Sequence, residues 1–155
     1  MRQDIGFFNV GAEFPDLVIE DGDLKADNGL ETACLISLFS DKRVAREDIP
    51  SGEINPRGWF ADEIAEPLED KLGSILWLYD RGKLTNDAAL KIEDGTRDAL
   101  QWLLDDGIAK KLEILATVIE SEKVTVAIKI YKPDGDSIPF KFIWDGQALK
   151  IIGAA

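Results

Sequence analysis

The chain has 155 residues, with 18 lysines and arginines against 30 aspartates and glutamates, and a formal net charge of −12. This acidity argues against nucleic acid as a partner, because phosphate backbones are bound by clusters of lysine and arginine. A hydrophobic content of 45% and a length typical of one domain predict a globular chain with its own core. The lack of histidine excludes Ser-His-Asp and Cys-His catalysis.

Sequence signals for export, metal binding and phosphate binding are missing. Cys34 is the only cysteine, which excludes an internal disulfide and a metal site of the CxxC kind. The first ten residues have no long apolar segment, no run approaches the roughly 20 apolar residues of a membrane span, and no Gly-rich phosphate-binding motif occurs. We therefore expect a protein made and folded in a reducing cytoplasm, with no cofactor and no membrane partner.

The first structured segment is predicted to be a β-hairpin over residues 17–27, because Asp21-Gly22 tolerates the positive φ values of a tight turn. A helix should follow, with Asp27 or Asn28 as its cap and an apolar surface wider than a single stripe. Residues 44–68 then form a long connection, and loops of this length in compact domains usually carry function.

Two further helices are expected in the middle of the chain. Residues 73–83, GSILWLYDRGK, predict a short helix, and the period of the following apolar positions predicts a longer one, capped by Thr85 or Asn86. Gly107 is expected to end the longer helix. Gly95, inside it, costs about 1 kcal/mol relative to alanine and indicates close packing or a local weak point.

After the last helix the apolar period changes from helical to alternating. The segments 112–119, 124–132 and 137–144 are joined by short turns and predict an antiparallel meander. The LKIIG segment that follows either adds an edge strand or stays loose. The predicted fold class is therefore α+β: an N-terminal β-hairpin, three helices and a C-terminal antiparallel β-meander, in a single domain over residues 1–155.

Carboxylates are the remaining route to catalysis. Asp62 and Glu63 beside Trp59 form the candidate pair, since a glycosidase needs two carboxyl groups roughly 5–10 Å apart. With 30 acidic residues such pairs arise easily by chance. DGDLKADNG resembles part of a calcium loop, but the twelfth position counted from Asp21 is Thr32, where that loop needs glutamate. A hairpin is the better interpretation, and no metal site is predicted.

Residues 56–63, PRGWFADE, place Trp59 and Phe60 in a stretch bracketed by loop residues. Two adjacent aromatics on a surface are costly unless something covers them. Either the protein's own core or a partner covers them, and the residues leave both possibilities open. Arg57 is expected to fix the loop by pairing with an acid. The other tryptophans fall on predicted helices or on the last strand, where core packing is their usual role.

Five segments in order resemble the small baseplate protein of Mu-like phages and prophages, the counterpart of the small wedge protein of contractile tails. The resemblance runs from about Asp16 to Asp145. The Glu-Pro-Arg signature of the wider wedge family is not evident, and its nearest position is Leu112-Glu113-Ile114. The five segments are DGDLKADNGLETACLISLFSDKRV, PRGWFAD, GSILWLYDRGKL, ALQWLLDDGIA and YKPDGDSIPFKFIWDG.

The resemblance implies a structural subunit without catalytic function, present in several copies in the virion tail baseplate and made in the host cytoplasm. The implied partners are a larger wedge protein, the tail sheath subunit, whose first ring it would template, and hub or spike proteins. The acidic excess ends before residue 111, and the neutral β-rich tail suits strand-to-strand pairing with another subunit.

We expect the partner interface to use one arginine together with aromatic and strand residues. Two alternatives remain, a carboxylate-dependent, lysozyme-like hydrolase of the tail and a cytoplasmic module that binds a peptide or small ligand. The candidate interface residues are Arg57, Trp59, Phe60, Trp77, Trp102, Ile128, Ile130, Phe140, Phe142 and Trp144.

Overall fold

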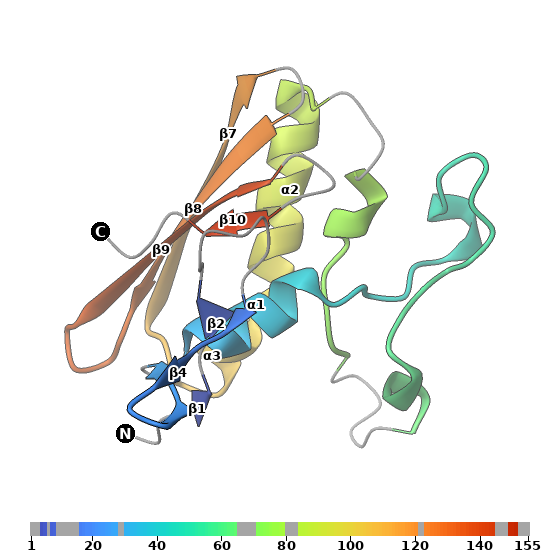
Figure 1. Ribbon diagram of the computed structural model, residues 1–155. Helices are drawn as coiled ribbons and strands as arrows, with labels where there is room; N and C mark the ends of the chain where they lie inside the picture. Colours follow the sequence, from blue (N-terminus) through green and yellow to red (C-terminus); the bar gives the residue numbers. More distant parts are fainter. Residues whose placement is uncertain are drawn as a thin grey trace.

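The computed structural model describes residues 4–5, 7–8, 16–27, 30–64, 71–79, 84–120, 123–144 and 149–151. Short paired strands come first, helices follow, and an antiparallel sheet completes the chain, which confirms the α+β class (Figure 1). The first six described strands form three antiparallel pairs: β1 (Asp4–Ile5) with β6 (Ala26–Asp27), β2 (Phe7–Phe8) with β3 (Asp16–Leu17), and β4 (Ile19–Glu20) with β5 (Asp23–Leu24).

The predicted N-terminal hairpin is present. Ile19 lies opposite Leu24 across β4 and β5, and the turn residues Asp21 and Gly22 have φ values of 54° and 86°. Both values lie in the left-handed region, which glycine adopts freely and aspartate tolerates. This segment is therefore a turn between strands, as the Asp21-Gly22 pair predicted.

The described helices are α1 (Glu31–Phe39), α2 (Asn86–Ala99) and the single-turn α3 (Trp102–Asp105). Thr85 caps α2 as predicted, because its Oγ1 accepts a hydrogen bond from the Ala88 N–H at 3.2 Å. Asp27 does not cap α1, since it is paired with β1, and Leu30 takes the N-cap position without a side-chain hydrogen bond. Asn28, the other predicted cap, lies outside the described residues.

The short helix predicted over residues 73–83 is corrected to a 3-10 turn in its described part. This turn is η3 (Leu76–Tyr79), and two similar turns are η1 (Arg46–Asp48) and η2 (Phe60–Glu63). An α-helix cannot start at residue 73, because Ser74 pairs with Asp41 in a parallel β-bridge. The described chain therefore has two helices longer than one turn, where the sequence predicted three.

The C-terminal meander is confirmed as an antiparallel sheet, and the LKIIG segment contributes a strand to it. The described strand order is β10–β9–β8–β7, so β7 and β10 lie at the two ends of the sheet, and α2 packs beside β7 on one face (Figure 1). The strands are β7 (Lys111–Glu120), β8 (Lys123–Tyr131), β9 (Ser137–Trp144) and β10 (Leu149–Ile151).

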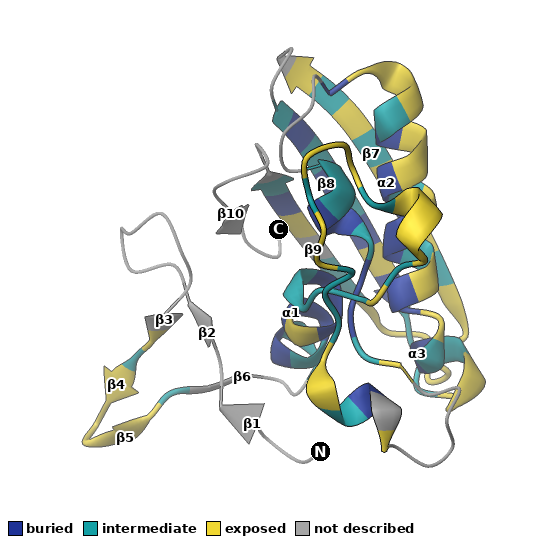
Figure 2. Ribbon diagram, turned by 90° about the vertical axis from the view of Figure 1, so that its right-hand side faces the viewer, coloured by how far each residue is buried: buried dark blue, intermediate teal, exposed yellow. Residues whose placement is uncertain are grey.

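The hydrophobic core lies between the helices and the inner face of this sheet. Phe142 of β9 is fully buried and meets Phe39 of α1 edge-on, with ring centroids 5.2 Å apart. Gly95 allows Ile75 to approach α2, because an added Cβ would lie 2.8 Å from Ile75 Cγ1, which confirms the close packing predicted there. Figure 2 shows the buried residues of α2 on one side of the helix and its exposed residues on the other.

Replacing Thr96 with valine is expected to raise stability. Thr96 is fully buried in α2, and no described atom forms a hydrogen bond with its Oγ1. A buried hydroxyl without a partner costs about 1–3 kcal/mol, and valine has nearly the same shape. Thermal denaturation should show a midpoint roughly 2–4 °C above that of the wild type. The control Thr117→Val, on the exposed side of β7, should leave the midpoint nearly unchanged, and a lower midpoint for Thr96→Val would contradict the expectation.

Candidate partner interface

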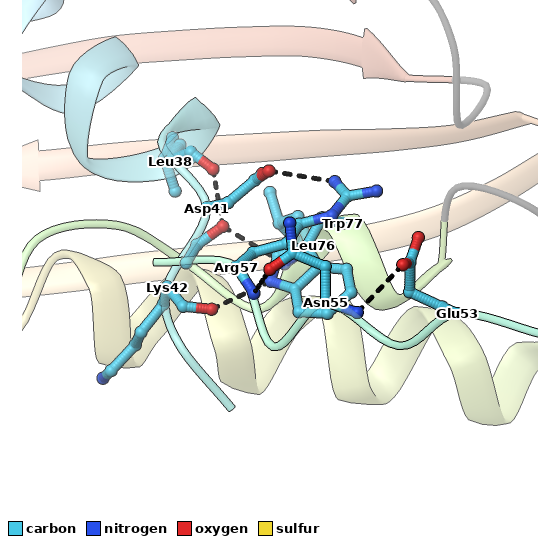
Figure 3. Close-up of polar contacts among 9 residues, drawn as sticks. Leu38, Asp41, Lys42, Glu53, Asn55, Arg57, Leu76 and Trp77 are labelled. Atoms are coloured by element: carbon cyan, nitrogen blue, oxygen red, sulfur yellow. Dashed lines mark hydrogen bonds and ion pairs between the residues drawn. The ribbon is translucent and has the colours of Figure 1, made fainter. Parts of the chain in front are cut away.

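The long loop is attached to the domain by Trp77 and Arg57 (Figure 3). Trp77 is buried, and its Nε1–H donates a hydrogen bond of 2.9 Å to the Lys42 carbonyl oxygen. The Arg57 guanidinium lies 4.4 Å from the centre of the Trp77 ring and donates to Asp41 Oδ2 at 2.9 Å. The predicted pairing of Arg57 with an acid is confirmed. A cation over an aromatic face contributes about 0.5–2 kcal/mol, and the ion pair adds direction to the contact.

A close backbone approach supports the same attachment. The Ser74 N–H donates to the Ser40 carbonyl oxygen, the Lys42 N–H donates to the Ser74 carbonyl oxygen, and both bonds measure 2.9 Å. Gly73, with φ +103°, makes this approach possible, because a Cβ there would lie 2.5 Å from the Ser40 carbonyl oxygen. The chain after α1 is therefore fixed against the segment that leads into η3.

The far end of the loop is held by a second approach. Arg57 and Gly58 are both left-handed, with φ values of 53° and 98°. The Arg57 N–H donates to Asn55 Oδ1 at 2.9 Å, and a Cβ on Gly58 would lie 2.6 Å from the Cβ of Arg43. A left-handed backbone conformation at an arginine costs energy, and the ion pair and ring contact of the Arg57 side chain offset this cost. The backbone is thus fixed immediately before Trp59.

Trp59 and Phe60 project from this fixed point. Trp59 is 45% exposed and Phe60 is 80% exposed, and their ring centroids lie 5.5 Å apart. Ile64, at the end of η2, and Ile54, earlier in the loop, are 76% and 93% exposed. The domain's core therefore leaves much of this aromatic pair uncovered. An exposed pair of aromatic side chains on a fixed backbone is typical of a protein-binding surface.

The outer face of the C-terminal sheet is a second candidate surface. Leu115 and Ile119 of β7 are 63% and 50% exposed, because the odd-numbered residues of this strand point away from α2. Nearer the start of β7, Glu113 accepts hydrogen bonds from Lys111 Nζ at 2.6 Å and from the Tyr131 hydroxyl at 2.7 Å. The hydrogen bond from Lys111 is the main reason that the pKa of the Glu113 carboxyl lies below its ordinary value.

Half of the ten predicted interface residues have a packing role in the isolated chain. Ile128, Ile130 and Phe142 are at most 2% exposed, Trp77 is buried under the loop, and Trp102 Nε1–H donates to Ser37 Oγ at 3.1 Å. The structure brings Arg57 and Trp77 together and leaves Trp59 and Phe60 exposed beside them. Phe140 and Trp144 lie on β9, and their side chains are outside the described part of the chain.

Sequence reasoning missed the exposed aliphatic residues. Leu115 and Ile119 lie on a strand whose sequence, KLEILATVIE, is apolar on both faces in its second half. A strand of this kind at the end of a sheet with one helical layer must expose one face, so the signal was present. Ile54 and Ile64 lie within or beside PSGEIN and FADE and have no periodicity that would identify them.

The described residues do not assemble an evident catalytic or metal centre. Asp62, the first member of the candidate carboxylate pair, is buried, and its Oδ1 accepts a hydrogen bond of 3.2 Å from the Leu72 N–H. Cys34 is buried in the core. The described residues contain no group of three or more potential metal-ligating side chains, and no described helix is long and apolar enough to cross a membrane.

The chain belongs to a family of phage proteins. The family model for phage protein GP46 matches residues 30–137, which include the anchored loop, both long helices and the first two strands of the sheet. The chain is 32% identical over 127 residues to baseplate protein gp46 of Escherichia phage Mu, an alignment that covers 81% of this chain and 86% of the relative. The resemblance to Mu-like baseplate proteins is thereby confirmed.

A second relative comes from a prophage. The chain is 33% identical over 122 residues to the Mu-like prophage FluMu protein gp46 of Haemophilus influenzae, with 79% of this chain and 82% of the relative covered. No solved structure matches the chain significantly.

Gly73→Ala is expected to destabilise the protein strongly. The added Cβ meets backbone atoms of Ser40 and Asp41, which cannot move without breaking the bridge to Ser74. Gly135→Ala is the matched control, because Gly135 has a similar φ of +98° and no atom within 4 Å of the added Cβ. Thermal denaturation should show a clearly larger fall for Gly73→Ala. Equal falls in the two variants would mean that the backbone approach contributes nothing.

Lys111→Ala is expected to raise the pKa of the Glu113 carboxyl toward its ordinary value, because the hydrogen bond from Lys111 is the largest cause of its depression. Tyr131→Phe should raise it less, since the Tyr131 hydroxyl is the smaller cause. A depressed folded-state pKa stabilises the fold above the unfolded pKa, and this stabilisation is lost as pH falls through the folded pKa. An NMR titration of the carboxyl carbon measures each value, and an unchanged pKa in Lys111→Ala would refute the assignment.

Proposed function

We propose that this chain is a structural subunit of a contractile phage-tail baseplate, where it joins a larger wedge protein and templates the attachment of the sheath. The proposal is supported by family membership and by a relative that is named as a baseplate protein. The site of action that follows is the virion tail, near hub or spike proteins. In this role the chain acts by binding other proteins, and no catalytic step is required.

The aromatic pair on the anchored loop is the structural observation that carries the proposal. Trp59 and Phe60 follow directly after Arg57 and Gly58, whose backbone is fixed by side-chain and packing contacts. Aromatic side chains on a fixed backbone bind well, because little conformational freedom remains to be lost on association. We assign this pair to the contact with the larger wedge protein.

The end of the C-terminal sheet suits the contact with the sheath. β7 is ten residues long, and β8 is its neighbour in the described sheet. An edge strand offers N–H and C=O groups to a strand from another chain, and its exposed side chains add specificity. The buried residues Ile128, Ile130 and Phe142 serve this contact indirectly, because they hold the sheet that carries the edge.

Trp59→Ala and Phe60→Ala are expected to impair assembly more than folding. Phe60 is 80% exposed and Trp59 is 45% exposed in the isolated chain, and neither belongs to the hydrophobic core, so the thermal midpoint should change by only about 1–2 °C. Loss of a central aromatic anchor costs about 2 kcal/mol or more in binding, which corresponds to a roughly 30-fold weaker complex. Titration calorimetry with the purified larger wedge protein of the same phage measures this change.

Leu90→Ala is the matched control for this experiment. Leu90 is 62% exposed on α2, outside the loop segment, so its truncation removes exposed apolar surface. The Leu90→Ala variant should bind as tightly as the wild type. If Trp59→Ala binds equally well, the aromatic pair is not the contact, and if it loses most of its thermal stability, the pair serves the domain's own fold.

A further inference from the structure

We propose that Glu93 is a latch over the edge of β7, which keeps this edge closed until a strand from another tail protein replaces it. The inference rests on the proposed function, since it concerns the strand edge that we assign to the sheath contact. It adds a residue that controls access to that edge.

The latch is a hydrogen bond between the helix and the strand. Glu93 lies on α2, and its Oε2 accepts a hydrogen bond of 3.3 Å from the backbone N–H of Ala116, in the middle of β7. Its other oxygen, Oε1, forms an ion pair of 3.1 Å with Arg97, one turn further along the helix. The Glu93 side chain is 21% exposed, so the carboxylate sits between the two elements while remaining within reach of solvent.

An edge strand needs such protection. Alternate residues of an edge strand direct their N–H and C=O groups away from the sheet, and these groups pair readily with any available strand. Native proteins cover such edges with helices or place charged side chains against them. Because Glu93 occupies the Ala116 amide, an added strand cannot continue its ladder past this point without displacing the carboxylate. Arg97 can remain paired with the Glu93 carboxylate after it leaves the Ala116 amide, so displacement does not leave a buried charge without a partner.

The occupant that fits this edge is an extended strand of another tail protein, with a basic side chain close to Glu93. A second copy of the wild-type chain fits less well, because an antiparallel pairing of two β7 edges would require both latches to open. A strand from a different protein needs to displace Glu93 from only one Ala116 amide. A lysine or arginine on that strand would compensate the carboxylate that it displaces.

The test compares Glu93→Ala with Asp94→Ala. Asp94 is the matched control, because it lies on the same helix, carries the same charge and also pairs with Arg97, at 3.2 Å, while its side chain is 77% exposed. Amide hydrogen exchange of the purified chain by NMR should show faster exchange at Ala116 in Glu93→Ala, by about tenfold for the loss of one hydrogen bond. The Ala116 amide of Asp94→Ala should exchange as in the wild type.

Sedimentation velocity on the same samples tests the consequence for pairing. Glu93→Ala should self-associate at concentrations where the wild type and Asp94→Ala remain monomeric, and the added change Ala116→Pro, which removes the amide, should restore the monomer. Unchanged exchange at Ala116, or a Glu93→Ala variant that stays monomeric, would overturn the proposal. If Glu93→Ala does not fold, Glu93→Gln, which keeps an acceptor oxygen, should still give faster exchange than the wild type, and an unchanged rate would again overturn it.

These measurements use the isolated chain, so they are independent of the partner assays. If the exchange and sedimentation results refute the latch but the chain still binds the wedge protein, the proposed baseplate role stands. Faster exchange and self-association in Glu93→Ala, together with no binding to tail proteins, would support the latch and refute the proposed function.

Discussion

The presentation of the exposed loop depends on the contact between the Trp77 ring and the Arg57 guanidinium. Trp77 is itself held by its hydrogen bond to Lys42, and Arg57 by its ion pair with Asp41, so the contact links the end of α1, the loop and η3 at one point. Ordering a loop residue on binding costs about 1–2 kcal/mol of backbone entropy. Because the backbone before Trp59 is already ordered in the isolated chain, less conformational entropy would be lost when the aromatic pair binds another protein.

The C-terminal sheet divides packing and contact between its two faces. Even-numbered residues of β8 fill the core against the helices, whereas odd-numbered residues of β7 are exposed. One face of the sheet is therefore packed into the core, and the other face is exposed at β7. Glu93 connects the two roles, since the helix that fills the core also supplies the carboxylate that covers the strand edge. A change that loosens α2 should consequently affect both the core and the edge.

Local sequence patterns predicted most helices and strands, but they did not predict the contacts between segments that are distant in the sequence. The strand expected over residues 137–144 has those bounds, and the Thr85 cap and the Asp21-Gly22 turn follow from local chemistry. The bridge between Asp41 and Ser74 replaces the start of a predicted helix, because pairing across 33 positions outweighs helix propensity. Alternation showed that Ile128 and Ile130 share a face, but only the position of α2 shows that this face is the core.

The central claim is that this chain is an assembly subunit that binds a larger baseplate protein. The most direct measurement is a pull-down of the tagged chain from a lysate in which tails assemble, with every retained protein identified and quantified by mass spectrometry. The account predicts recovery of a larger wedge protein and of sheath subunits in a fixed ratio. A folded, monomeric bait that retains no tail protein would contradict it.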